Sequence, residues 1–316
     1  VIIKTGTTAV GTLQQNHGGI VGLLHLHVTQ ILDGLVTQCP IVTGSRGGKR
    51  VMVVLTDYSN GNDMLIGKGG VKSLKDLKGK KVAVELGFVE HLLLLNGLKK
   101  GGMKEAHVTL VNTKTKEMPQ MLATKDIAAV GCWQPIANEA LKAVPGSRPI
   151  YTSADEPGLI YDVLAVSPTS AKKQRADWVK VVKVWDKVVT YINDPKTQPD
   201  AVKIMAARSG VAPADYLPLL KGTKLLSLSE ASKVYVKGAD FKTLQGSTKI
   251  VDEFNVANAV YKAPEKIDRP VGYVKKDSGN ALWGMRFWSW FPIRLEYRIA
   301  YLEPDYSVTI IGRSKR

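Results

Sequence analysis

Cysteine and long apolar runs are both scarce in this sequence. Of 316 residues only Cys39 and Cys132 are cysteines, which is too few for a disulfide framework. We expect both to be buried small apolar side chains. No apolar run approaches the roughly 18–20 residues that a membrane-spanning helix requires. With 44% hydrophobic residues, the chain is long enough to form two globular domains.

The sequence also lacks recognisable catalytic and metal-binding motifs. It has no Ser/His/Asp or Cys/His constellation, no paired acid–base carboxylates within one motif and no metal-ligand cluster, so we expect no catalysis and no cofactor. Gly44–Arg50 (GSRGGKR) and Gly61–Lys68 lack the spacing of a phosphate-binding loop, which argues against nucleotide binding. His25 and His27 alternate as on one face of a strand, and we expect them to pack or face solvent rather than bind metal.

Acidic residues are outnumbered by basic ones, 28 to 44, which gives a formal net charge of +16. Such a charge makes nucleic acid a conceivable partner. The lysines, however, are scattered along the chain, and no motif for binding DNA or RNA accompanies them. We therefore expect a solvated basic surface and no nucleic-acid partner.

The most informative stretch is Val71–Pro135. Lys81–Glu85 is a β-branched run, Gly87 a turn residue and Val89–Leu98 an apolar stretch, so the pattern predicts strand, turn and helix. Gly97 and the Gly101–Gly102 pair are expected to stop that helix.

The pattern continues with a strand at His107–Asn112, a short helix at Met118–Thr124 and a strand at Asp126–Trp133. Alternating strands and helices predict a mostly parallel sheet, whose ligands collect beyond the carboxyl ends of the strands. The residues that fall at such ends are Glu85, Gly87, Phe88, Cys132, Trp133 and Gln134.

The turn before the helix carries conflicting charges. The free N–H groups of Leu86–Glu90 would seat an anionic oxygen. Glu90 is expected only to complement the helix dipole. Glu85, at the strand end, would repel a bare anion and attract an amine, amidine or amide. Trp133 offers an aromatic plane for stacking or for contact with a cation.

Two further polar positions can be read in two ways. Arg50–Tyr58 is an apolar strand that runs into a cluster of turn formers, in which Ser59 and Asn60 either make an ordinary turn or hydrogen-bond a ligand. Asp162 either contacts ligand or holds a hinge loop. Ala176–Asn193 is an amphipathic helix whose apolar side includes Val188 and two tryptophans, which we expect to be core. Further helical segments are expected at Asp200–Ser209, Ala212–Leu220, Leu225–Leu228, Ser229–Lys237 and Thr243–Asn258.

The ordered motifs DYSNGND, VKSLKDLKGKKVAVELGFVEHLLLL, VTLVN, DIAAVGCWQP and YTSADEPGLIYDVLAVSP resemble extracytoplasmic substrate-binding proteins of ABC importers. The branch is the one that serves nitrate, sulfonates, taurine, urea-like amides and thiamine-pyrimidine precursors. The resemblance covers about Asp33 to Val271. It implies two doubly wound α/β lobes, joined by two crossover strands, of the type II periplasmic-binding-protein class.

The resemblance also sets expectations for domains. Residues 1–67 plus 167–275 would form lobe one and 68–166 lobe two, with crossovers near Asp63–Lys68 and Asp162–Val166. The family pattern is missing from Val1–Gln30, where no signal peptide is visible, so we expect a chain without its leader. Residues 276–316 also depart from the family and form an atypical C-terminal extension, either a partner-binding addition or residues foreign to the natural reading frame.

Function follows from the same resemblance. It implies a monomeric, periplasmic or otherwise extracytoplasmic receptor that closes on one small ligand and delivers it to a membrane permease. The ligand site would comprise Ser59, Asn60, Glu85, Gly87, Phe88, Trp133, Gln134 and Asp162. The alternative is an enzyme of thiamine-pyrimidine synthesis or breakdown on the same scaffold, for which Cys132 is the candidate nucleophile.

Overall fold

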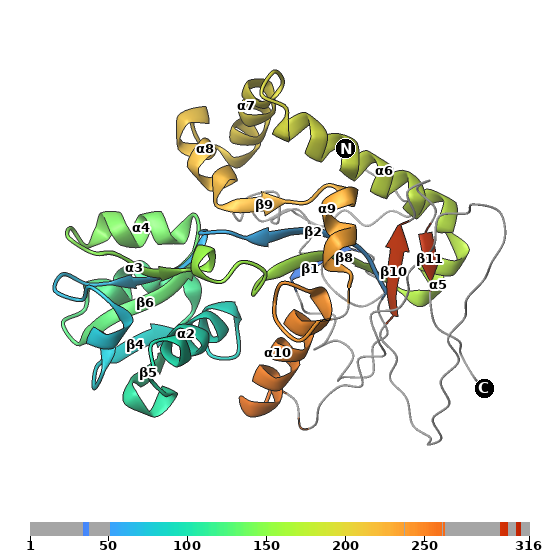
Figure 1. Cartoon of the computed structure of the whole chain (residues 1–316). Coiled ribbons are helices and arrows are strands. Elements are labelled where there is room, and N and C mark those ends of the chain that lie inside the picture. Colours follow the sequence, from blue (N-terminus) through green and yellow to red (C-terminus); the bar gives the residue numbers. More distant parts are fainter. Residues whose placement is uncertain are drawn as a thin grey trace, which may run out of the picture.

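The structure, a computed structural model, describes residues 34–37, 51–236, 238–260, 262, 298–302 and 308–310. These residues form two α/β lobes, each built on one β-sheet, with helices packed on the sheets (Figure 1). The expected fold class is confirmed. The predictions for Val1–Gln30, for Cys39, for Gly44–Arg50 and for most of residues 276–316 lie outside the described residues.

The first sheet has the strand order β1-β8-β2-β10-β11, and β9 also pairs with β2. Strand β8 lies between β1 and β2 and is antiparallel to both, whereas β10 is parallel to β2. Strand β2 is apolar along most of its length because both of its faces are covered. The strands are β1 (Gly34–Thr37), β2 (Val51–Ser59), β8 (Tyr161–Val166), β9 (Thr223–Leu225), β10 (Arg298–Leu302) and β11 (Val308–Ile310).

The second sheet has the order β5-β4-β6-β3-β7. Strand β4 is parallel to β5 and β6, while β3 is antiparallel to β6 and β7. The carboxyl ends of β4, β5, β6 and β7 therefore meet the amino end of β3 at one edge. These strands are β3 (Asp63–Gly67), β4 (Lys81–Val84), β5 (Thr109–Asn112), β6 (Ile127–Trp133) and β7 (Arg148–Thr152).

Helices cover both faces of the second sheet. On one face α2 (Val89–Lys100) packs its leucines on β4 and β3, and on the other lie α3 (Met118–Ala123) and α4 (Ile136–Ala143). The sequence analysis did not predict α4. Short 3-10 turns complete this region at Leu74–Leu77, Glu105–His107, Thr115–Glu117 and Ser153–Asp155.

The expectation that Gly97 helps stop α2 is wrong, because the helix runs on to Lys100. Gly97 is needed for packing instead. A Cβ atom at this position would come within 2.9 Å of the Tyr151 ring and of Leu74, so glycine allows Tyr151 of β7 to lie directly against the helix.

The remaining helices follow β8 and line the first sheet (Figure 1). In α6 the buried side chains are Val182, Val189 and Ile192. Trp178 and Trp185 are partly buried in apolar clusters, as predicted, but Val188 is exposed rather than buried. Leu225 ends strand β9 and is not helical. The helices are α5 (Pro168–Lys173), α6 (Arg175–Asn193), α7 (Gln198–Ser209), α8 (Pro213–Lys221), α9 (Leu228–Val234) and α10 (Leu244–Ala257). None of the helices described in this structure is long and apolar enough to cross a membrane.

Helix α10 contacts both lobes. Its first residue, Leu244, is buried with Met52 and Leu55 of the first sheet. Further along, Val251 and Phe254 join the core under α2, and the Phe254 ring lies edge-on to His91 at 5.2 Å between centroids. Helix α10 was expected within the lobe-one segment 167–275, and that division of the chain remains a prediction.

Two connections carry the chain between the sheets. The Ser59–Asn62 turn joins β2 to β3, and the residues after β7 lead back to β8. Strand β3 lies within the second sheet, so the chain changes lobes in the turn before it.

Candidate functional site

Polar groups gather where the second sheet presents the carboxyl ends of its parallel strands. Asp63, at the start of β3, stands opposite Trp133, at the end of β6. Directly opposed residues of neighbouring strands project to the same face of a sheet. This is the face that α2 covers, since Leu65, two residues after Asp63, belongs to the α2 core. Trp133 is half-buried, so its ring lies at the border of that core.

Glu85 follows β4 at the same edge. Its Oε2 atom accepts hydrogen bonds from the backbone N–H and the hydroxyl of Thr115, both at 2.9 Å. Glu85 therefore already has hydrogen-bond partners within the chain. Its role in ligand binding stays a prediction.

The turn before α2 does not offer free amides to an anion at its first three positions. The N–H of Leu86 donates to Asn112 Oδ1 at 3.1 Å, that of Gly87 to His91 Nδ1 at 3.3 Å and that of Phe88 to the Glu85 carbonyl at 3.2 Å. The expected anion seat at Leu86–Glu90 is corrected accordingly, because at these three positions the chain itself satisfies the donors.

Gly87 and Phe88 have different surroundings. Gly87 has a φ of +81°, a conformation that glycine adopts without strain, and it allows the Glu85–Val89 turn. Phe88 is the N-cap of α2 and is 53% exposed. An aromatic ring left in solvent at the edge of the site is available to a ligand.

Gln134 is held by its neighbours after β6. Its backbone N–H donates to the Asn62 carbonyl at 3.0 Å, and its side-chain amide hydrogen-bonds Asn138 of α4. The backbone contact joins the end of β6 to the turn between the two sheets.

The Ser59–Asn62 turn is fixed from both sides. The Ser59 hydroxyl is 2.7 Å from that of Ser153, and the Asn60 N–H donates to the Gly222 carbonyl at 2.8 Å. Asn62 donates to Thr223 of β9, also at 2.8 Å. These bonds account for the turn without a ligand, and contact of Ser59 and Asn60 with a ligand remains a prediction.

On the first sheet, Asp162 of β8 lies opposite Asp57 of β2. Both carboxyl groups are buried, and Asp162 Oδ1 has no hydrogen-bond partner among the described residues. Burial, aided by the charge of Asp63, raises the pKa of Asp57 to about 6. Burial, followed by the charges of Asp57 and Asp63, holds the pKa of Asp162 well above its ordinary value.

A second acid pair, Asp63 and Glu90, lies on the second lobe. Glu90 is 0% exposed, and neither of its oxygens has a hydrogen-bond donor among the described N–H and hydroxyl groups. Burial, then the charge of Asp63, holds its pKa well above the ordinary value. Burial also raises the pKa of Asp63, and its interaction with Ser59 offsets part of the rise. Burial therefore favours the protonated form of Glu90.

The sequence analysis missed this acid cluster, which we define as Asp57, Asp63, Glu90 and Asp162. Only Asp162 was a candidate, and Glu90 was expected to act on the helix dipole alone. Glu90 is instead packed over β6, where a Cβ atom on Gly131 would come within 3.0 Å of the Glu90 Cβ. The missed signal was Gly131, a glycine inside an apolar strand, which indicates close approach of another group.

Cys132 is buried among residues of α3 and α4, as predicted. Burial raises the pKa of its thiol far above the ordinary value, and the charges of Glu90 and Asp63 add to the rise. The thiolate that nucleophilic catalysis needs is thus disfavoured at neutral pH. Within the described ranges, no group of three or more His, Cys, Asp or Glu side chains is arranged to hold a metal ion.

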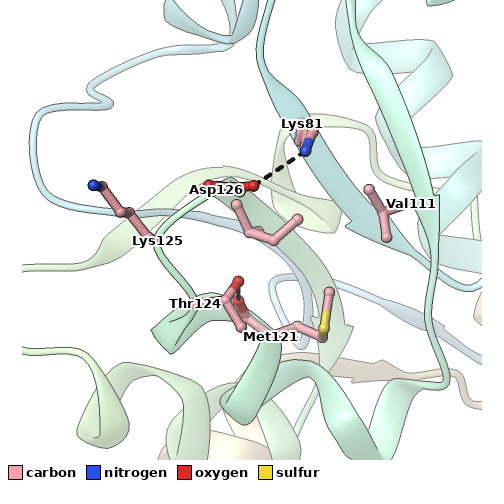
Figure 2. Close-up of a pocket in the computed structure, with 7 residues that line it drawn as sticks. Lys81, Val111, Met121, Thr124, Lys125 and Asp126 are labelled. Atoms are coloured by element: carbon pink, nitrogen blue, oxygen red, sulfur yellow. Dashed lines mark hydrogen bonds and ion pairs between the residues drawn. The ribbon is translucent and has the colours of Figure 1, made fainter.

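A shallow pocket of about 300 Å³ lies at the opposite edge of the second sheet (Figure 2). It is found at the amino ends of β4 and β6, where Lys81 and Asp126 form an exposed ion pair at 3.2 Å. Ligands of parallel α/β sheets bind at the other edge, so we do not assign the ligand to this pocket. Its lining consists of Lys81, Val111, Met121, Thr124, Lys125, Asp126 and Ile127.

The fold is a two-lobed α/β scaffold with polar residues at the carboxyl edge of its second sheet. Residues 37–198 match the family model described as NMT1/THI5 like. The chain belongs to this NMT1/THI5-like family.

Sequence relatives agree with this assignment. The taurine-binding periplasmic protein of Escherichia coli is 26% identical over 239 residues, which cover 69% of this chain and 72% of that protein. A protein of Brucella abortus named as a binding protein is 34% identical over 94 residues. That match spans only 30% of this chain and 30% of the relative.

Solved structures share the fold. The ligand-binding component of an ABC-type import system from Staphylococcus aureus has a TM-score of 0.57 at 15% identity, covering 74% of this chain and 76% of its own. The aliphatic sulphonate binding protein SsuA of E. coli has a TM-score of 0.53 at 19% identity, with 61% and 68% covered. The desulfurization enzyme DSZB has a TM-score of 0.52 at 15% identity, with 77% and 84% covered.

Proposed function

We propose that this protein is the solute-binding receptor of an ABC importer. It captures a small polar ligand that contains nitrogen or sulfur between its two lobes and delivers it to a membrane permease. Binding stabilises a closed arrangement through contacts from both lobes. The protein works as a monomer outside the cytoplasm, where such receptors meet their ligands.

The main support for this proposal is the set of polar and aromatic residues that the two lobes contribute near their junction. Asp57 and Asp162 come from the first sheet, while Asp63, Trp133 and Glu85 come from the edge of the second sheet where ligands collect. The relatives whose names state a function are mainly binding proteins, including those for taurine and for sulfonates. Membership of the family supports the same role.

The alternative is an enzyme on the same scaffold. Its support is that the desulfurization enzyme DSZB shares this fold. The candidate nucleophile for this alternative is Cys132. Its complete burial on the α3 and α4 side, away from Trp133, counts against it. A receptor, unlike the enzyme, does not require a reactive thiolate at Cys132.

A thermal-shift panel tests the proposal. We expect at least one of taurine, alkanesulfonates, nitrate, urea, amidines and aminopyrimidines to raise the melting temperature in proportion to the logarithm of its concentration, because a ligand that binds only the folded state stabilises it. A compound that is consumed during the assay would indicate the enzyme instead. No shift with any member at millimolar concentration would contradict a receptor for this class of ligand.

Replacing Trp133 by alanine is expected to weaken binding of the panel's best ligand by at least ~1 kcal/mol, about fivefold in Kd, because the ring supplies stacking or cation–π contact. Calorimetry on the purified variant measures the change. Tyr191→Ala, which removes an exposed ring on α6, is the control and should leave affinity unaltered. Equal affinity in wild type and Trp133→Ala would assign Trp133 to the core.

A further inference from the structure

The acid cluster has no counter-charge in the part of the chain that the structure describes. None of Asp57, Asp63, Glu90 and Asp162 takes part in an ion pair there. The ion pairs among the described residues each join a lysine to a different acidic side chain. This holds in a protein with a formal net charge of +16. Buried carboxylates are normally paired with a cation or bound to metal, and here the described groups supply neither.

Some oxygen atoms of the acid cluster are buried and accept no hydrogen bond from the described residues. Both oxygens of Glu90 and Oδ1 of Asp162 are inaccessible to solvent and lack hydrogen-bond partners. Asp63 connects them, since its charge acts on Glu90, on Asp57 and on Asp162. Such acceptors cost free energy unless a donor reaches them.

The groups that face the cluster come from several elements. Tyr58 and Tyr161 lie beside Asp57 and Asp162, with their rings edge to face at 5.8 Å. On the second lobe, burial lowers the pKa of His91, Cys132 stays a thiol, and the charge of Glu85 acts on Glu90. None of these described neighbours is a lysine or an arginine.

The turn beside the cluster also lacks free amide donors for an anion at three of its positions. The amides of Leu86, Gly87 and Phe88 already donate within the chain. The same edge carries the Trp133 ring, and the Asp63 carboxyl group stands on the strand position opposite it. A ring face and a carboxylate together are complementary to a cation.

We infer that the ligand carries a protonated nitrogen, an ammonium or amidinium group, which Asp63 binds beside Trp133 with Asp162 facing it from the first sheet, and that binding expels protons which the empty cluster holds. The inference rests on the proposed receptor function and specifies its ligand. Glu90 is a positioning residue. It keeps its proton in the empty protein and releases it to solvent when the ligand's charge arrives.

Two matched pairs of probes test the inference by calorimetry. Acetamidine and acetamide have the same shape, and only the first is a cation. Taurine and 2-hydroxyethanesulfonate differ in an ammonium against a hydroxyl. We expect the charged-nitrogen member of at least one pair to bind about tenfold tighter than its partner or more, the order expected for a charge-assisted hydrogen bond. The heat should vary with the ionisation enthalpy of the buffer, as net proton release requires.

Variants test which residues bind the charged nitrogen and which residue releases the proton. Asp63→Asn should weaken binding of the charged probe by about tenfold or more and leave that of its neutral partner unchanged. Glu90→Gln keeps the size of the side chain and removes its titratable proton, so the affinity should change little while proton release falls. Asp126→Asn is the matched control, because Asp126 is an exposed carboxylate at the opposite edge of the same sheet. Circular dichroism and melting curves check that each variant is folded.

The outcomes separate the two proposals. Binding of sulfonates or nitrate with no preference for charged nitrogen, or an Asp63→Asn variant that binds the charged probe as tightly as wild type, would overturn the inference and leave the receptor intact. Absence of binding by these probes and by the wider panel would overturn both.

Discussion

Asp57→Asn is expected to stabilise the folded protein at pH 7.5 by up to about 3 kcal/mol. Burial raises the pKa of Asp57 from 3.8 to about 6, and each unit of difference between folded and unfolded states is worth about 1.4 kcal/mol. Because the folded state holds this proton more tightly, the stability contributed by protonation is complete below pH 3.8 and is lost as the pH rises through 6. At pH 7.5 the wild type thus keeps an unfavourable buried charge, which asparagine removes.

Chemical unfolding at two pH values measures this effect. The gain in the free energy of unfolding should be largest at pH 7.5 and should shrink toward zero or become negative at pH 4.5, where the aspartic acid is already neutral. Asp126→Asn should stay within about 0.5 kcal/mol of wild type at both values. An Asp57→Asn variant that is destabilised at pH 7.5 would mean that a cation from another part of the chain neutralises Asp57.

Gly158→Ala is expected to cost about 3 kcal/mol or more of folding free energy. Gly158 precedes β8 with a φ of +91°, and a Cβ atom there would lie 2.1 Å from the Phe241 carbonyl oxygen and 2.6 Å from the Tyr161 hydroxyl. The left-handed conformation costs an alanine about 1–2 kcal/mol, and the contact with backbone adds an overpacking cost of about 1–3 kcal/mol.

The matched control for this variant is Gly146→Ala. Gly146 has a similar φ of +83°, but a Cβ atom there would meet nothing within 4 Å. The difference between the two variants in urea unfolding therefore isolates the contact with Phe241. Equal losses for Gly158→Ala and Gly146→Ala would show that the loop carrying Phe241 moves aside without cost.

The regular elements could be predicted because their signals are local. The β-branched run at Lys81–Val84 and the leucines of α2 repeat with the periods of a strand and a helix. Gly97 was misread because its role is set by Tyr151, which is far away in the sequence. Helix α4 was missed because it is short and follows Pro135 directly.

The site was harder to predict from the sequence, because its contacts also join residues that are far apart in the sequence. Positions at the ends of strands, such as Trp133 and Glu85, follow from the element pattern alone. Whether a carboxyl group there is paired depends on contacts across the fold. Thr115 satisfies Glu85, whereas Glu90, one turn further along, is buried without a donor. Local charge patterns do not distinguish the two residues.

Helix α10 acts as a strut between the lobes. It starts in the core of the first sheet at Leu244 and ends in the core under α2 at Val251 and Phe254. A helix of 14 residues does not shorten or stretch, so its length sets the angle at which the two sheets face each other. Any swing of one lobe must detach one end of the strut. Leu244, Val251 and Phe254 are all buried, and the contact of Phe254 with His91 places one end of the strut next to the helix that carries Glu90.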